Sequence, residues 1–119
     1  MIYAKGIPLG EERTYVFARD VRKYVKSLPK SMSNFEDVKQ VIRSSGSIGA
    51  NYIEANEALS KKDFLMRIRI SRKEAKESIF WLRLLVDNNP DEFKDIGEKL
   101  TIEATELKKI LSAIIEKTK

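Results

Sequence analysis

Apolar side chains recur every three or four residues along most of this chain, which is the spacing of one face of an α-helix. The pattern occupies four segments, and none of them shows the strict alternation of apolar and polar residues that is typical of a half-buried strand. A chain patterned in this way buries its apolar stripes by packing helix against helix. The stripe of the second segment, for example, consists of Phe35, Val38, Val41, Ile42, Ile48 and Tyr52.

Short polar joints separate these segments, and a leader of ten residues (1–10) precedes the first. Joints this short make consecutive helices antiparallel neighbours. The sequence therefore predicts an all-α fold, an antiparallel up-down four-helix bundle. A chain of 119 residues is expected to form a single domain over 1–119. The expected helices span about residues 11–28, 34–57, 61–87 and 90–117.

Residues at the ends of the segments have the chemistry of helix caps. Ser33 followed by Glu36, and Ser60 followed by Asp63, have the spacing of a capping box. Pro90 is suited to the first position of a helix, after an asparagine that can act as the cap. We therefore expect the second and third helices to begin directly after these serines and the fourth to begin at Pro90.

The third and fourth segments carry more large apolar residues than one seam inside a bundle needs. Either these additional side chains are deeply buried, or they form a second face that contacts another subunit. Because a small domain buries little surface by itself, we expect self-association. The additional side chains are Leu65, Ile70, Trp81, Leu84, Leu85, Ile102, Ile110 and Ile115.

The absence of Cys and His limits the chemistry that this chain can perform. Disulfides and thiolate metal sites are excluded, and the commonest general base and metal ligand is missing. Di-metal sites in bundles normally use Glu-x-x-His pairs, whereas Glu54/Glu57 and Glu74/Glu77 lack the histidine. We therefore expect no metal, no cofactor and no small-molecule substrate. The prediction is a protein that is not an enzyme, and a cryptic carboxylate site is the weakest hypothesis.

The sequence shows no targeting or membrane segment. No stretch approaches the roughly 18 consecutive apolar residues of a membrane-spanning helix. The first residues also lack the apolar run of a secretory signal peptide. We therefore expect a cytoplasmic protein that has no membrane partner.

A set of polar residues at helical spacing marks the second and third segments. If these two helices are antiparallel about Ser60, residues equally distant from that joint lie level, so Glu77 faces Arg43 and Asn51 faces residues 69–72. Glu54 would face the turn at Arg67 or reach Arg69. The favoured interpretation is an ion-pair and hydrogen-bond network that sets the helix register; the alternative is a polar pocket for a ligand or RNA. The members of this set are Arg43, Ser47, Asn51, Glu54, Arg72, Glu74 and Glu77.

The basic residues, which give a net charge of +5, are concentrated on the first and third segments. Rows of cations can neutralise phosphates with release of counterions. A row of charges is also what a solvated helix face needs, so both interpretations stay open. Repetition of the rows around an oligomer would favour binding. The two rows are Arg19, Lys23 and Lys26 on the first segment, and Arg69, Lys73 and Lys76 on the third.

Gly46-Ser47-Ile48-Gly49 has the Gly-x-x-Gly spacing of an RNA-binding loop, but it lies within a helical pattern. We interpret these glycines as a small-residue surface that allows another helix to approach closely, or as a local kink.

Residues 43–55, 60–64, 70–77 and 81–85 resemble the four-helix-bundle proteins encoded within intervening sequences of bacterial 23S ribosomal RNA genes. The resemblance implies a bundle that assembles into a ring, commonly a pentamer. Some distant relatives are reverse-transcriptase accessory proteins of diversity-generating elements, and they bind nucleic acid through a basic surface. Ala55 and Lys73 stand where many members have glycine. The matched motif positions are Arg43, Ser47, Asn51, Glu54, Phe64, Arg72 and Glu77.

Taken together, these features favour a non-enzymatic, self-associating bundle that binds structured RNA or an RNA–protein complex through the two basic rows. The alternative is a structural or protein-interaction module with no direct nucleic-acid contact, such as a reverse-transcriptase accessory protein. In that case the second apolar face would bind the partner, and the charge would only aid solubility.

Overall fold

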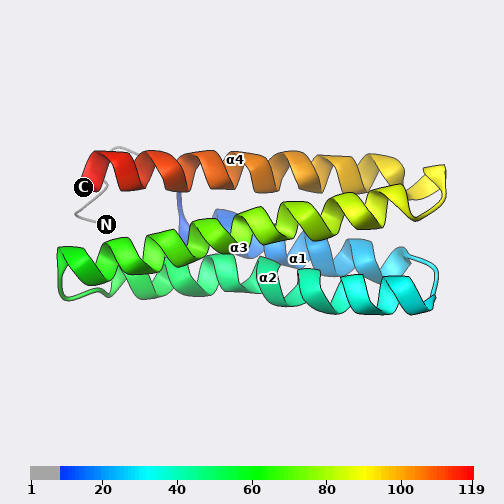
Figure 1. Ribbon diagram of the computed structural model, residues 1–119, viewed down its shortest axis with the longest axis horizontal. Helices are drawn as coiled ribbons and strands as arrows, with labels where there is room; N and C mark the ends of the chain where they lie inside the picture. The colour runs from blue at the N-terminus through cyan, green and yellow to red at the C-terminus, as the bar shows by residue number, and fades with distance from the viewer. Residues whose placement is uncertain (1–8) are drawn as a thin grey trace.

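The computed structural model describes residues 9–119, which form four long helices joined by short turns (Figure 1). The predicted all-α four-helix bundle is confirmed, and consecutive helices run in opposite directions (Figure 1). Of the predicted leader at 1–10, residues 1–8 lie outside the described range. The elements are α1 (Glu11–Ser27), α2 (Met32–Asn56), α3 (Lys61–Asp87), the 3-10 turn η1 (Asp91–Phe93) and α4 (Lys94–Thr118).

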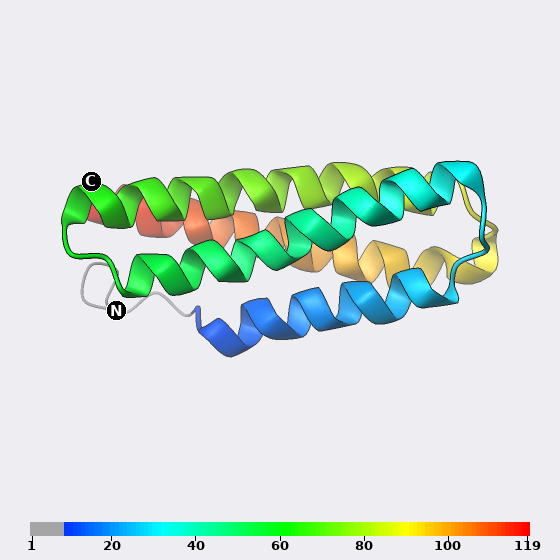
Figure 2. The ribbon, with the colours of Figure 1, turned by 90° about the horizontal axis from the view of Figure 1, so that it is seen from below.

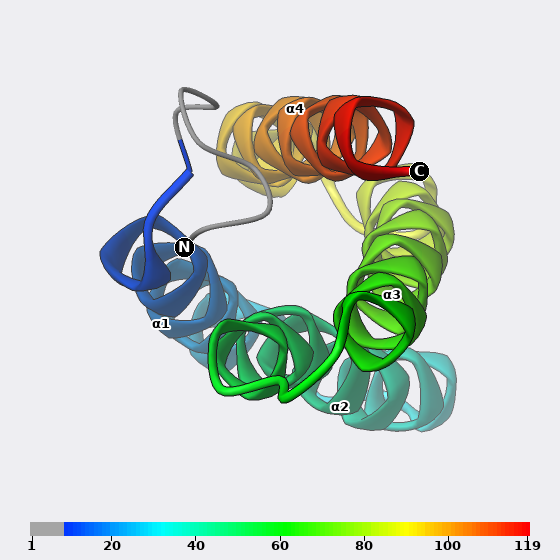
Figure 3. The same cartoon turned by 90° about the vertical axis from the view of Figure 1, so that its left-hand side faces the viewer.

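The bundle is a rod of 45 × 21 × 19 Å with one helix at each corner. Seen end-on, the helices follow each other around the axis in chain order, so α1 neighbours α2 and α4 and lies diagonally opposite α3 (Figure 3). The helix α1 is the shortest of the four, and it begins partway along the rod (Figure 2).

The core runs the length of the rod and takes large side chains from every helix. Burying one such side chain is worth roughly 1.5–3 kcal/mol, so this row of contacts is the main source of stability. The largest side chains that are less than 2% exposed are Phe17, Val21, Val41, Ile48, Tyr52, Phe64, Ile68, Leu82, Leu85, Leu107, Leu111 and Ile114.

The additional apolar residues of α3 and α4 divide between the core and the surface. Leu65, Leu85 and Ile115 are buried, whereas Ile102 is 62% exposed. The prediction that Phe35 belongs to the core is wrong, because its side chain is 71% exposed. Asn34 takes the inward position of that first helical turn, and its amide nitrogen donates to the Pro29 carbonyl at 2.8 Å.

Two of the predicted helix starts are wrong, and one cap is confirmed. Ser60 caps α3 as predicted, since its hydroxyl accepts a hydrogen bond from the Asp63 amide at 3.1 Å. The cap of α2 is Ser31 rather than Ser33, and α2 begins two residues earlier than predicted. Ser31 has the extended backbone of a cap residue, and its hydroxyl accepts from the Asn34 amide at 3.2 Å.

Asn89 does not cap the fourth helix; its side chain connects the turn after α3 to the start of α2. Its side-chain amide exchanges hydrogen bonds with that of Asn34, at 2.7 and 2.9 Å, and also donates to the Leu85 carbonyl at 2.8 Å. The fourth helix consequently starts with the 3-10 turn η1, and its α-helical part begins at Lys94 rather than at Pro90. The paired amides fix the first turn of α2 to the turn after α3.

Two glycines mark places where helices approach too closely for a side chain. A Cβ atom on Gly49 of α2 would lie 2.8 Å from the Thr14 hydroxyl oxygen of α1. A Cβ atom on Gly97 of α4 would lie 2.5 Å from Val86 Cγ2 of α3 and 2.6 Å from the Tyr24 hydroxyl oxygen of α1. Gly49 therefore allows α1 and α2 to approach closely, as the sequence suggested. Gly97 allows the same close approach where α1, α3 and α4 meet.

We expect Gly97→Ala to lower the free energy of unfolding by about 1–3 kcal/mol, because the added methyl group overpacks this junction. The loss should outweigh the gain in helix propensity of roughly 1 kcal/mol. Gly46→Ala is the matched control, since its Cβ would meet only the flexible end of Arg22 at 3.2 Å. Urea denaturation followed by circular dichroism measures both. Equal stability of the two variants would contradict this account of Gly97.

Candidate nucleic-acid interface

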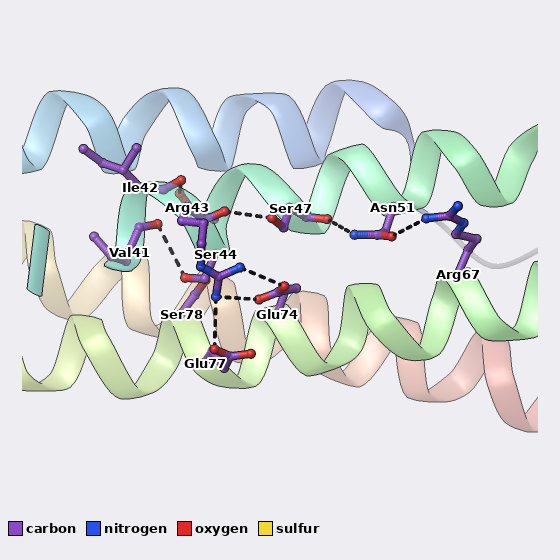
Figure 4. Close-up of polar contacts among 11 residues, drawn as sticks. Val41, Ile42, Arg43, Ser44, Ser47, Asn51, Arg67, Glu74, Glu77 and Ser78 are labelled. Carbon is purple, nitrogen blue, oxygen red and sulfur yellow. Dashed lines mark hydrogen bonds and ion pairs between the residues drawn. The ribbon is translucent and has the colours of Figure 1, made fainter. Parts of the chain in front are cut away.

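One side of the seam between α2 and α3 is held by an arginine that contacts two carboxylates (Figure 4). The Arg43 guanidinium donates to both oxygens of Glu74, at 3.1 and 3.2 Å, and to one oxygen of Glu77 at 3.1 Å. The sequence register placed Glu77 beside Arg43, and the structure has both carboxylates there. This two-carboxylate contact, formed by Arg43 with Glu74 and Glu77, is called the Arg43 clamp below.

The Arg43 clamp neutralises a carboxylate that the fold has removed from water. The Glu74 side chain is 8% exposed, whereas that of Arg43 is 49% exposed. The side-chain hydrogen bond with Glu74 raises the pKa of Arg43 above its ordinary value; burial opposes this rise, and the charges of Glu74 and Glu77 add to it. A buried carboxylate without such a partner would destabilise the bundle.

Small polar side chains fill the seam behind the Arg43 clamp. The hydroxyls of Ser44 and Ser78 are completely buried and lie 2.8 Å apart in a hydrogen bond (Figure 4). Ser71 is equally buried and donates to the Ile48 carbonyl at 2.8 Å. Since serines are short, α2 and α3 can approach closely while each buried hydroxyl keeps a partner.

Two further members of the predicted polar network, Ser47 and Asn51, are connected along α2, because the Asn51 amide donates to the Ser47 carbonyl at 2.9 Å (Figure 4). Asn51 accepts a hydrogen bond from Arg67 at 3.2 Å, rather than from residues 69–72 (Figure 4). Ser47 donates within its own helix, to the Arg43 carbonyl at 2.9 Å. Arg72 lies toward α4, where it makes a weak hydrogen bond of 3.5 Å with the Ser112 hydroxyl.

Glu54 is exposed and makes no side-chain hydrogen bond or ion pair within residues 9–119. Arg67, its expected neighbour, is bound to Asn51 instead. A different ion pair, which the sequence did not suggest, joins α1 to α4: Arg13 donates to both oxygens of Glu103, at 2.8 and 2.9 Å. Ninety positions separate these two residues, and no local pattern connects them.

The basic row of α3 lies on the outer side of the helix. Arg69, Lys73 and Lys76 are exposed, and in the described part of the chain none of them has an ion pair. They border a hollow of about 380 Å³ that Arg72, Glu77 and Phe80 also line. The structure thus gathers four cations around one depression, called the α3 hollow below.

The basic row of α1 borders a larger groove, between α1 and α2. Arg19, Lys23 and Lys26 line it together with Arg22, and its volume is about 630 Å³. Gly46, Gly49 and Ala50 of α2 lie along the same groove. Arg19 also pairs with Asp20, at 3.1 Å on the surface. The two basic rows lie on α1 and α3, which are diagonally opposite in the bundle (Figure 3).

Within residues 9–119, no group of three or more Asp or Glu side chains is placed to hold a metal ion. No helix among these residues has both the length and the apolar composition needed to cross a membrane.

The 23S rRNA-intervening sequence protein family matches residues 11–113. The chain belongs to this family. A crystal structure of a protein with unknown function from the S23 ribosomal protein family of Bacteroides thetaiotaomicron is also similar. The two chains are 34% identical, with a TM-score of 0.78, over 89% of this chain and 97% of the other. No curated protein matches. The family resemblance seen at residues 43–85 is therefore confirmed for this 23S rRNA-intervening sequence family member.

We expect Arg43→Met to lower the free energy of unfolding by about 1–3 kcal/mol, because Glu74 would stay buried without its partner. The estimate is below that for a fully buried pair, since Arg43 is half exposed. Arg19→Met is the matched control: its pair with Asp20 lies on the surface, so its effect should stay within about 0.5 kcal/mol. Chemical denaturation measures both, and similar effects would contradict the role of the Arg43 clamp.

Proposed function

We propose that this family member is a non-enzymatic, self-associating bundle that binds structured RNA, or an RNA–protein complex, through the basic rows of α1 and α3. The cations that would neutralise phosphates are Arg19, Lys23, Lys26, Arg69, Lys73 and Lys76. The observation that carries this proposal is the α3 row, which is exposed and has no ion pairs among the described residues although glutamates lie on the same helix.

The Arg43 clamp accounts for this lack of pairing on α3. Glu77 lies four residues after Lys73 and would be a natural helical partner for it. Arg43 of the neighbouring helix holds Glu77 at 3.1 Å instead, and it also holds Glu74. Lys73 and Lys76 therefore keep their full charge toward solvent, where a polyanion can exchange it for counterions.

Support for self-association comes from apolar side chains that the single bundle leaves in solvent. Within residues 9–119, nine large apolar side chains are between 46% and 96% exposed. Ile102 is the member of the predicted second face that remains on the surface, between the charged neighbours Glu98 and Glu106 of α4. We propose that a second copy of the chain covers it; the family resemblance favours a pentamer. The nine are Tyr15, Met32, Phe35, Ile53, Leu59, Met66, Phe80, Ile96 and Ile102.

We expect RNA affinity that falls steeply with salt, and a shallower salt dependence for the double variant Lys73→Gln/Lys76→Gln. Each lost phosphate contact should reduce the slope of log K against log salt by about 0.7–0.9. The control is Lys94→Gln/Lys109→Gln, which removes the same charge from α4, where both lysines pair with glutamates of their own helix. Fluorescence anisotropy with labelled 23S rRNA fragments measures the affinities.

Two results of this titration would count against RNA binding. One is the absence of binding at low salt, and the other is an equal effect of the α3 and α4 variants. Either result would favour the alternative of a protein-interaction module. In that case binding of a protein partner should survive Lys73→Gln/Lys76→Gln, because the charges would only aid solubility.

We expect light scattering to give a solution mass several times the 13.7 kDa of one chain. Ile102→Asp should lower this mass toward that of one chain, because a buried unpaired carboxylate opposes association. Lys109→Asp, an exposed change on the same helix, is the control and should leave the mass unaltered. A wild-type mass of one chain at all concentrations would rule out self-association, and an unchanged mass for Ile102→Asp would exclude this surface.

A further inference from the structure

We infer that the α3 hollow binds an unpaired RNA base stacked on Phe80, with the neighbouring phosphates on the basic row. The ligand recognised there is therefore single-stranded RNA, such as a loop or bulge of a structured RNA. This inference rests on the proposed RNA binding and adds the class of RNA and the residue that selects it.

Phe80 is an exposed aromatic residue within the basic row itself. Its side chain is 55% exposed and lines the α3 hollow beside Arg69, Lys73 and Lys76. The four residues are spaced four, three and four apart, so they form one stripe along the outer face of α3. At 1.5 Å per residue, the cations span about 10 Å and Phe80 lies about 6 Å beyond the last of them.

The Phe80 ring is restrained by a partly buried neighbour. The ring of Trp81 meets it edge to face, with centroids 4.9 Å apart and an angle of 84°. Trp81 itself packs against the hydrophobic core. A stacking platform that is already held in place loses little conformational freedom when a base binds.

The combination of an aromatic ring with phosphate-binding cations fits unpaired RNA better than a duplex. A-form duplexes present phosphates and 2′-hydroxyls, whereas their base faces are stacked inside. Proteins that bind single strands combine a positively charged groove with aromatic side chains on which the bases stack. Phe80 would add nothing to duplex binding, while the cations would serve both kinds of RNA.

A second copy of the chain is a less suitable occupant for this hollow. Pairing the same surface of two copies face to face would bring Arg69, Lys73 and Lys76 against their own counterparts, and like charges placed together oppose that symmetric contact. A ring interface joins two different surfaces instead, and the mass measurement below tests for it. A single RNA strand can instead place its phosphates on the cations while one of its bases stacks on the Phe80 ring.

The test compares a labelled 12-nucleotide oligoadenylate with a 12-base-pair RNA duplex, using fluorescence anisotropy at low salt. Phe80→Leu keeps an apolar side chain but removes the stacking surface. We expect it to weaken binding of the single strand roughly 5- to 100-fold and to leave duplex binding nearly unchanged. Phe80→Trp should retain single-strand binding. Phe35→Leu is the matched control, because Phe35 is also exposed and lies outside the hollow, and it should have no effect.

Each result either supports or overturns the inference. Unchanged single-strand binding by Phe80→Leu, or an equal loss for strand and duplex, would overturn the stacking role while leaving RNA binding by the cations intact. No binding of either RNA by the wild-type protein would overturn the proposed function as well. A lower mass of Phe80→Leu in light scattering would assign Phe80 to a subunit contact instead.

Fluorescence of Trp81 gives an independent readout, because it is the only tryptophan of the chain and touches the Phe80 ring. Titration with unlabelled oligoadenylate should change its emission, while the duplex should change it little. An unaltered emission at saturating oligoadenylate would place the base elsewhere.

Discussion

The buried carboxylate of Glu74 constrains the arrangement of α2 and α3. A charge that is 8% exposed persists only beside a partner, and Arg43 is the residue of α2 that supplies one. The pairing of Arg43 with Glu74 therefore favours the observed register between the two helices. In that register the buried hydroxyls of Ser44 and Ser78 also meet, and Ser71 reaches the Ile48 carbonyl. The electrostatic contact and the close packing of small side chains thus specify the same alignment.

The same contact also connects stability to the proposed binding surface. An arginine that bonded only Glu74 would leave Glu77 available to the lysines of its own helix. Arg43 holds both carboxylates, so Glu77 already has an ion-pair partner although it lines the α3 hollow beside the cations. The positive charge of the α3 hollow therefore has two causes. One is the number of basic residues on α3, and the other is the pairing of the α3 glutamates with Arg43.

The sequence predicted the contacts that follow from local spacing and missed those that depend on helix rotation. Arg43 and Glu77 are equally distant from the Ser60 joint, so a regular rise along two antiparallel helices brings them level. Arg72 was assigned to the same network, yet it lies toward α4, because a small rotation of α3 decides which neighbour a flanking residue meets. The pairing of Arg13 with Glu103 depends on how the first and last helices close the bundle, which no local pattern encodes.

The two basic rows lie on diagonally opposite helices, because the first and third helices are diagonal in a bundle that follows chain order around its axis (Figure 3). In an assembly, a symmetry operation can bring the α1 row of one copy toward the α3 row of the next, so that both rows contact one RNA. Self-association and RNA binding would then depend on each other, since each row alone offers three cations and affinity rises with the number of phosphates neutralised together.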